Sequence, residues 1–383
     1  MKITKYIFAF VCCFILFTTN AQEKKLSLSG YVSGMPSIIV QDSKEVWWQA
    51  LVHNRFSFNW QMGKYFSMDV GMRNRLIFGS EMMLNPKSIG FDAGWFDLSW
   101  NWKEGKNTVI NSSYDRLFFT FEKNKWKLQL GRQRINWGQT LVWNPNDIFN
   151  TYSFFDFDYP ERAGCDAFRG TYFQNETTLH EIVVSINNAN KITAAYLCRW
   201  NFKGVDFQVI AGEQTETDLV IGGAFTCDLK GLNIRSELSY FHPIKNLIDT
   251  SGIVALSLGL DYIFSNSLML QVEALYNNVD KSFSVNGLTG LYGAPLSAKN
   301  LSICEWNLFA QVSYPFTSRL NGSLSSIYFV DIRSCYAGMS LDISIIENLD
   351  LSFIAQYFYI HGPKTSPVKT HLLLSFMRLK YSF

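Results

Sequence analysis

Long apolar runs are scarce in this chain of 383 residues, which limits how it can meet a membrane. The longest run near the amino terminus is too short for a helix that spans a bilayer, which needs about 20 apolar residues. Farther along, the apolar stretch 253–260 is interrupted by Asp261, and other stretches break sooner. The sequence therefore argues against a protein built of transmembrane helices.

Neither sign of charge is in excess. The chain has 34 Lys and Arg residues against 32 Asp and Glu residues, and only 17% of its residues are charged. It has no basic tract of the kind that binds nucleic acid, so we expect no nucleic-acid partner.

Cysteine and histidine are also sparse. Two of the seven cysteines lie within the first 21 residues, and the other five are widely spaced with no C-x-x-C pair. We expect them to be small apolar strand residues and not a disulfide framework or metal site. They are Cys165, Cys198, Cys227, Cys304 and Cys335.

Motifs of common enzyme classes are missing as well. The five histidines are scattered, and the chain has no H-E-x-x-H, P-loop or dinucleotide fingerprint. A surface lipid hydrolase with a Ser–His pair stays open as an alternative, because such pairs need no sequence proximity. We expect no enzyme activity and no cofactor.

The carboxyl-terminal segment shows what the chain does contain, which is period-two alternation. The odd-numbered residues from 373 to 383 are apolar except for Ser375, and the even-numbered residues from 378 to 382 are charged or polar. A strand between lipid and water needs this pattern. The apolar parity comprises Leu373, Met377, Leu379, Tyr381 and Phe383, and the polar parity ends with Arg378, Lys380 and Ser382.

This segment resembles the closing strand of bacterial outer-membrane β-barrels. Their terminal Phe is similar to Phe383, and the resemblance implies that it is read by the barrel-insertion machinery. The alternative interpretation is an ordinary half-buried last strand of a soluble sandwich.

The amino terminus predicts export. Lys2 and Lys5 precede an apolar run over residues 6–17, and Ala21 offers a small residue at the expected cleavage point. We therefore predict a signal peptide over residues 1–21 and a mature domain over residues 22–383. An exported chain with 16% Phe, Trp and Tyr suits the aromatic girdles of a transmembrane barrel, although a secreted sugar-binding sandwich is a rival.

The alternation recurs as hairpins along the chain. Residues 46–60 place apolar side chains on even positions, with His53 and Arg55 on the opposite face. After a turn at residues 62–64, residues 66–78 repeat the pattern, with Arg73 and Arg75 on the inward face. A closed barrel in lipid buries the apolar face and satisfies every backbone hydrogen bond.

Short turns alternate with long polar connections. We predict short turns near residues 103–106, 122–125, 201–204, 228–231, 264–267, 315–318 and 346–348. We predict long connections over residues 79–94, 138–164, 242–252, 278–303 and 361–368. This asymmetry is typical of an outer-membrane barrel. At roughly 20 residues per strand and connection, we expect an all-β, antiparallel up-and-down transmembrane barrel of about 18 strands, within a range of about 16 to 20.

The densest polar motif lies within residues 130–169. Here the chain resembles porin-like outer-membrane channels of the alginate-export type, in which G-R-Q-x-x-x-W-G is followed by N-P-x-D and R-x-G. The resemblance implies that the loop 138–164 folds into the pore and lines its constriction. The matching residues are Gly131, Arg132, Gln133, Trp137, Gly138, Asn144, Pro145, Asp147, Arg162 and Gly164.

The alternation of side chains along the strand decides whether the arginines of this motif can face the lumen. Continued alternation from Trp126 would aim Arg132 and Arg134 toward lipid, so we expect a bulge at Gly131 that turns both into the lumen. Arginines facing loop carboxylates would create a field across the lumen that sorts polar solutes, or else would only pin the loop to the wall. The candidate constriction residues are Arg132, Gln133, Arg134, Asn136, Trp137, Asp147, Asp156, Asp158, Glu161, Arg162 and Arg169.

These observations predict a porin-like channel in the outer membrane of a Gram-negative bacterium, which passes small polar solutes passively and with partial selectivity. Its expected partners are outer-membrane lipid, the insertion machinery and those solutes, and the sequence does not fix an oligomeric state. The alternative is an accessory barrel for the export or assembly of a polysaccharide, lipid or protein.

Overall fold

The computed structural model describes residues 25–80, 86–245, 247, 250–278, 296–361 and 369–383, which form an almost entirely β structure. The predicted signal peptide lies outside these residues and stays a prediction. The elements are β1 (Leu26–Gln41), β2 (Glu45–Gln61), β3 (Phe66–Gly79), α2 (Pro86–Ile89), β4 (Ser99–Glu104), β5 (Thr108–Lys123), β6 (Trp126–Gln133), β7 (Cys165–Phe173), β8 (Thr178–Ile186), β9 (Ile192–Phe202), β10 (Val205–Gln214), β11 (Asp218–Leu229), β12 (Leu232–Pro243), β13 (Ile253–Ile263), β14 (Met269–Asn277), β15 (Trp306–Thr317), β16 (Leu320–Phe329), β17 (Ser334–Ile346), β18 (Leu349–His361) and β19 (Lys369–Ser382).

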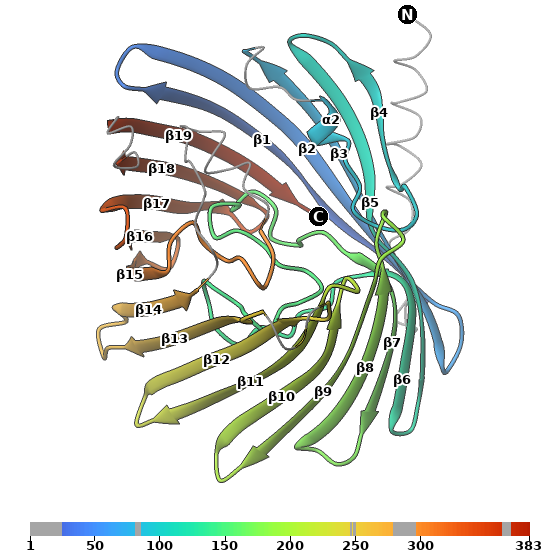
Figure 1. Ribbon diagram of the computed structural model, residues 1–383. Coiled ribbons are helices and arrows are strands. Elements are labelled where there is room, and N and C mark those ends of the chain that lie inside the picture. The colour runs from blue at the N-terminus through green and yellow to red at the C-terminus, as the bar shows by residue number, and fades with distance from the viewer. Residues whose placement is uncertain (1–24, 81–85, 246, 248–249, 279–295, 362–368) are drawn as a thin grey trace, which may run out of the picture.

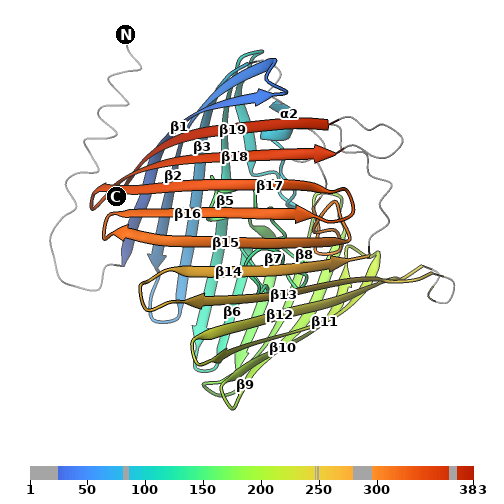
Figure 2. The ribbon, with the colours of Figure 1, turned by 90° about the vertical axis from the view of Figure 1, so that its left-hand side faces the viewer.

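The sheet closes into a ring because β1 pairs with β2 on one side and with β19 on the other. Strand β4 lies outside the ring, since β3 pairs directly with β5 and β4 borders only the part of β5 that β6 does not reach. The nineteen strands of the sheet, less β4, therefore make a closed antiparallel barrel of eighteen, which confirms the predicted number. Figure 1 looks obliquely into the ring, and Figure 2 shows the strands from the side.

Each strand presents one face outward and one inward, as the alternation predicted. In β2, Val46 and Trp48 are 62% and 51% exposed, whereas His53 and Arg55 are buried. The apolar parity of β19 from Leu373 to Phe383 is likewise exposed around the outside of the ring. An apolar exterior around a polar interior suits a barrel surrounded by lipid. Among the described residues, no helix is long and apolar enough to cross a bilayer.

The connections follow the predicted asymmetry with some departures. Strands β6 and β7 are joined by residues 134–164 at one end of the barrel, and tight turns join most strand pairs at the other. Short turns at residues 42–44 and 215–217 also occur at the long-loop end. The predicted turn at 103–106 joins β4 to β5 and belongs to this end too. The predicted connections 79–94, 242–252, 278–303 and 361–368 lie partly outside the described residues.

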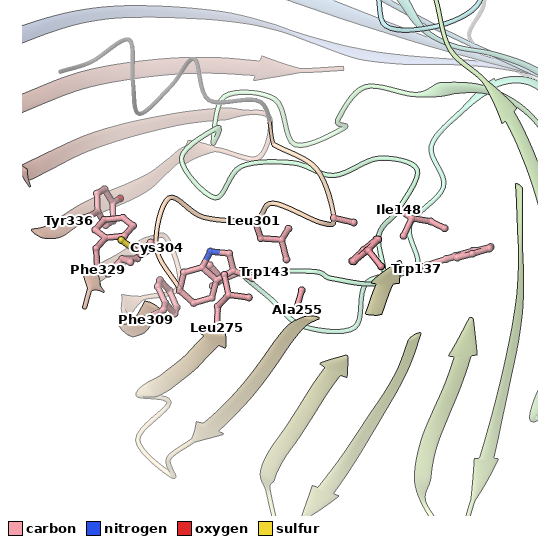
Figure 3. Close-up of a cluster of buried hydrophobic side chains, with 14 of the residues drawn as sticks. Trp137, Trp143, Ile148, Ala255, Leu275, Leu301, Cys304, Phe309, Phe329 and Tyr336 are labelled. Carbon is pink, nitrogen blue, oxygen red and sulfur yellow. The ribbon is translucent and has the colours of Figure 1, made fainter. Parts of the chain in front are cut away.

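The largest apolar cluster lies inside the ring. Inward-facing side chains of β7 to β19 pack against residues 135–148 of the β6–β7 connection and against residues 298–304, which precede β15. Figure 3 shows Trp143 beside Leu275 and Phe309, with Leu301 nearby. The lumen of this barrel therefore contains a packed core of its own.

The five described cysteines are free. Four of them lie in strands, as predicted, whereas Cys304 lies in the segment that precedes β15 and is buried in the apolar cluster.

Candidate functional site

The candidate site is the connection between β6 and β7, residues 134–164, which we call the lumen insert. It leaves the wall after Gln133, crosses the inside of the ring and returns at Cys165, as the green trace within the barrel shows (Figure 1). It begins four residues earlier than the loop 138–164 that the sequence predicted. Its outgoing half passes β8 to β14, and its returning half passes β15 to β19 and then β1 to β5.

Two wall glutamates hold the backbone of the outgoing half. Glu237 of β12 accepts hydrogen bonds from the backbone N–H groups of Thr140, at 2.6 Å, and Asn146, at 2.9 Å. Glu273 of β14 accepts three more, from the N–H groups of residues 141–143, at 2.8–3.1 Å. Hydrogen bonds to a buried carboxylate are stronger than neutral ones. These two side chains therefore fix the outgoing half against the far wall.

Wall amides and hydroxyls add further contacts. Gln208 donates to the backbone carbonyl of Trp137 at 2.8 Å, and Gln214 donates to that of Ile148 at 3.1 Å. Ser239 donates to the carbonyl of Pro145 at 3.0 Å. Backbone carbonyls of the insert, like its N–H groups, thus find partners on the wall, as buried peptide groups require.

Apolar side chains of the outgoing half fill the lumen between these contacts. Trp137 and Trp143 are 1% and 6% exposed, and Trp143 meets Phe309 edge to face at 6.5 Å. The indole of Trp137 donates to Glu181 of β8 at 2.6 Å. Burying a large apolar side chain contributes roughly 1.5–3 kcal/mol, so these residues stabilise the docked insert. Both tryptophans are packing residues in this structure.

The returning half continues the aromatic packing. Phe154 lies 5.1 Å from Phe309, and Phe155 lies 5.1 Å from Tyr336 and 5.2 Å from Phe358, all between ring centroids. Such edge-to-face pairs add about 0.5–1.5 kcal/mol beyond the area they bury. The insert is therefore anchored along both halves.

Charged side chains replace aromatic ones where the returning half reaches β2 and β3. A guanidinium nitrogen of Arg73 lies 3.3 Å from the carboxylate of Asp158, and His53 Nδ1 lies 3.5 Å from the same oxygen. Burial raises the pKa of Asp158 to about 6, against the opposing effect of Arg73. The charge of this carboxyl therefore changes within the range of ordinary solution pH.

A bulge in β5 brings two further charges to the lumen. The register between β3 and β5 shifts after Gly71, which leaves Asp115 without a partner residue in β3. The side chains of the consecutive residues Asp115 and Arg116 therefore both face the lumen. Asp115 accepts two bonds from Arg55, at 2.8 and 3.0 Å, and one from the hydroxyl of Tyr159. Burial raises the pKa of Tyr159, so this hydroxyl keeps its proton and acts as the donor.

Arg116 holds the end of the insert. Its guanidinium donates to the backbone carbonyls of Glu161 and Arg162, the latter at 3.0 Å. The Glu161 carboxylate accepts a bond from Tyr31 of β1 at 3.0 Å. Arg162 lies over the ring of Tyr152, 3.9 Å from its centroid, and donates to the carbonyl of Asp156 at 2.7 Å.

Asp147 is the most deeply buried acid of the insert. Its side chain is fully enclosed, and neither carboxyl oxygen makes a hydrogen bond within the usual limits in the described part of the chain. The N–H groups of Trp137 and Asn150 face it without reaching that geometry. Burial, with Glu237 nearby, raises the pKa of Asp147 to about 7. The protonated form is thus the one that this environment favours.

Arg132 lies away from the other candidate arginines. It is 4% exposed, and it donates to Asp166 of β7 at 2.8 Å, to Asp92 and to the carbonyl of Phe96. The expected bulge at Gly131 is absent, because β6 stays in register with both β5 and β7. Arg132 therefore keeps the parity of the exposed Leu130 and is enclosed in the wall by residues 92–96.

The remaining candidates divide between wall and lumen. Gln133 is buried and donates to the carbonyl of Ala167 at 3.1 Å, and Asn136 is exposed. Arg134 lies over the ring of Tyr152 at 5.9 Å. Arg169 of β7 lies 2.7 Å from Glu181, the partner of the Trp137 indole. The structure thus brings Asp156, Asp158, Glu161 and Arg162 to one side of the lumen, and it places Arg169 and Asp147 on the other.

Sequence reasoning missed several residues that hold the insert. Glu181, Glu237 and Glu273 are the clearest, since each is the single carboxylate on the inward parity of its strand. That isolation was the available signal. Asp115 was also missed, because the bulge that turns it inward has no local motif.

The fold and the lumen together define a class, a transmembrane β-barrel of eighteen strands with a long connection folded inside. Solved structures have a similar fold. The chain is similar to OprD of Pseudomonas aeruginosa, with a TM-score of 0.60 and 8% identity over 96% of this chain and 99% of that one. It is also similar to OccAB4 of Acinetobacter baumannii, with a TM-score of 0.57 and 10% identity over 95% and 100% of the two chains.

A third similar structure is OpdQ of Pseudomonas aeruginosa, with a TM-score of 0.58 and 8% identity over 94% of this chain and 99% of that one. At such low identity these matches show the fold alone. No protein-family model matches the chain, and no curated protein matches its sequence.

Proposed function

We propose that the protein is a porin-like channel that passes small polar solutes across the outer membrane of a Gram-negative bacterium. The observation that carries the proposal is the division of the lumen into two sectors around the insert. Toward β7–β14 the insert is sealed to the wall by apolar packing and two glutamates. Toward β19, β1, β2, β3 and β5 it meets charged side chains.

We call this second region the charged sector. A water-filled path lined by ionised groups lowers the barrier for polar solutes and excludes apolar ones. Its cations outnumber its carboxylates when Arg378, which Asp342 balances, is left out, so we infer a preference for anions over cations. The cations are Arg55, Arg73, Arg75, Arg116, Arg162 and Lys380, and the carboxylates are Asp69, Asp115, Asp156, Asp158 and Glu161.

The proposed setting is a bilayer. The exposed apolar parity of every ring strand would contact outer-membrane lipid, and the barrel-insertion machinery would read the carboxyl-terminal strand. The resemblance of residues 131–164 to alginate-export-type channels supports the same general class, and no solute follows from it. We infer a transport role and no catalytic one.

Single-channel recording in a planar bilayer tests this function. The refolded protein without residues 1–21 is expected to give a steady open current, and a salt gradient should give a reversal potential of the sign for anion preference. A folded barrel without current would refute the channel and would favour an accessory barrel for export or envelope assembly.

A further inference from the structure

A cavity of about 230 Å³ lies against the inner wall beside the returning half of the lumen insert. The insert contributes Phe154 and Phe157 to its lining, and strands β15 to β19 contribute the rest. The wall residues that bear on binding are Ser323, Ser325, Tyr336, Ser340, Asp342 and Arg378. None of them belongs to the contacts that hold the outgoing half in place.

Hydroxyl groups and one carboxylate form a continuous chain along this wall. The hydroxyls of Ser323 and Ser340 lie 2.9 Å apart, and Ser340 donates to Asp342 at 3.3 Å. Ser352 donates to the other oxygen of Asp342 at 2.6 Å, and Arg378 donates to the Ser352 hydroxyl at 3.2 Å. A serine thus links the single carboxylate of the cavity to its single guanidinium, and the two charges balance.

Aromatic side chains form the other part of the lining. Phe154 and Tyr336 have ring centroids 6.0 Å apart, and Phe157 packs edge to face on Phe376 at 4.9 Å. Gly338 keeps space beside them, because a Cβ there would lie 2.2 Å from the Tyr336 hydroxyl and 2.6 Å from Ser325 Oγ. Any larger residue at this position would push the tyrosine out of place.

We propose that this cavity binds a neutral polyhydroxylated solute such as a sugar ring. The hydroxyls of such a ring can donate to Asp342 and exchange hydrogen bonds with the serines, while its C–H faces pack against the phenylalanines. This inference rests on the proposed channel, since the solute would reach the cavity through the lumen.

The charges next to the cavity favour a neutral ligand over an anion. Arg73 and Lys380, two cations of the charged sector, already have partners, since Arg73 pairs with Asp158 and Lys380 lies 4.4 Å from the centre of the Tyr31 ring. Within the cavity, Arg378 is linked through Ser352 to Asp342. An anion would meet the Asp342 carboxylate at once, whereas a hydroxyl can donate to it.

Titration calorimetry with D-glucose on the detergent-solubilised barrel tests the site directly. Wild-type protein is expected to show saturable binding, and Asp342→Asn should weaken it about tenfold or more, because a hydrogen bond to a charged acceptor is lost. Ser375→Ala is the matched control, since Ser375 lies exposed on the outer face of β19, and it should bind like the wild type. If Asp342→Asn does not fold, Ser340→Ala serves in its place and should also weaken binding.

Absence of saturable glucose binding by a folded wild-type barrel would overturn the proposal. Tighter binding of D-glucuronate than of D-glucose would overturn the neutral class. Planar-bilayer current separates this inference from the proposed function. Steady current without glucose binding refutes the sugar site and leaves the channel function intact. Glucose binding without current refutes the channel function and supports the sugar site.

Discussion

The Asp158 side chain shows how one residue of the insert links solution pH to the lumen. Its carboxyl is mostly enclosed beside Arg73 and His53, and burial raises its pKa to about 6. As pH falls through that value the carboxyl gains a proton, and the charged sector loses a negative charge. The balance of the lumen therefore becomes more positive on the acid side.

We predict that the anion preference of the channel increases as pH is lowered from 8 to 5, and that Asp158→Asn reduces this step. At pH 8 the variant should be more anion-selective than the wild type, because the amide carries no charge, and the part of the step that remains belongs to other buried carboxyls such as Asp147. Reversal potentials across a salt gradient, recorded at pH 8 and at pH 5, measure the ion preference of the wild type and of the variant. Asp228→Asn, in an exposed position at a tight turn, is the control. A pH step that persists unchanged in Asp158→Asn would assign it to another group.

A second residue-scale prediction separates Arg132 from Arg134. Arg132→Ala leaves Asp92 and Asp166 buried without their cation, a loss that costs about 3–5 kcal/mol. We expect a lower unfolding temperature and an unchanged reversal potential. Arg134→Ala, in the insert, should shift the reversal potential toward cations with a smaller thermal effect. Heat-induced unfolding followed by gel mobility, with bilayer recording of each variant, measures the two quantities.

Two other outcomes would change the roles assigned to Arg132 and Arg134. A selectivity change in Arg132→Ala at wild-type stability would mean that this arginine faces the conducting path and not the enclosed pocket of residues 92–96. Loss of stability in both variants without a change in selectivity would make both arginines structural.

At the scale of elements, the insert behaves as a separate piece docked against the wall. Glu273 of β14 alone accepts three backbone N–H groups of the insert and the hydroxyl of Ser257. Replacement by Ala removes these acceptors and leaves the N–H groups buried without partners. Each such group costs about 1–3 kcal/mol, enough to loosen the outgoing half while the ring strands stay paired.

We therefore predict that Glu273→Ala gives a folded barrel with larger and noisier conductance and with faster proteolysis within residues 134–164. Limited proteolysis with mass spectrometry locates the cuts, and bilayer recording gives the current. Glu347→Gln, in the exposed turn between β17 and β18, should match the wild type. An insert that stays protected in Glu273→Ala would show that its apolar packing is sufficient.

Strands were the elements that the sequence predicted best, because lipid on the outer side makes every second residue of a ring strand apolar. The alternation in the sequences of β2, β3 and β19 predicted which of their side chains face outward and which face inward. The features that were missed depend on contacts between distant segments. Arg132 meets residues 92–96, Glu237 and Glu273 meet the insert, and the bulge lies at Asp115 in β5 and not at Gly131 in β6. No local pattern encodes such partners.

At the scale of the whole molecule, the carboxyl terminus closes the ring. Phe383 exchanges two backbone hydrogen bonds with Gly30, at 2.9 and 3.0 Å, and its ring lies 6.0 Å from Phe56 on the outer face. Its position is thus at the seam between β19 and β1 and also on the surface that the insertion machinery would meet.

We predict that deletion of Phe383 lowers the amount of assembled barrel in cells far more than the yield of refolding in detergent. Deletion removes two backbone hydrogen bonds to Gly30 and one outer-face ring contact, a local loss, whereas a lost recognition signal stops insertion altogether. Heat-modifiable gel mobility of cell envelopes and of refolded protein measures both yields. Equal losses in cells and in detergent would make Phe383 a closure residue without a signalling role.

The anchors of the lumen insert have one further consequence, for the order in which the molecule folds. Glu237 and Glu273 lie between 91 and 132 positions downstream of the N–H groups that they hold. Contacts of such long sequence separation form slowly, because the intervening chain must be ordered first. The β6–β7 connection cannot adopt its final conformation until β14 has joined the wall. Loop docking is therefore a late step of folding that depends on strands synthesised well after the loop itself.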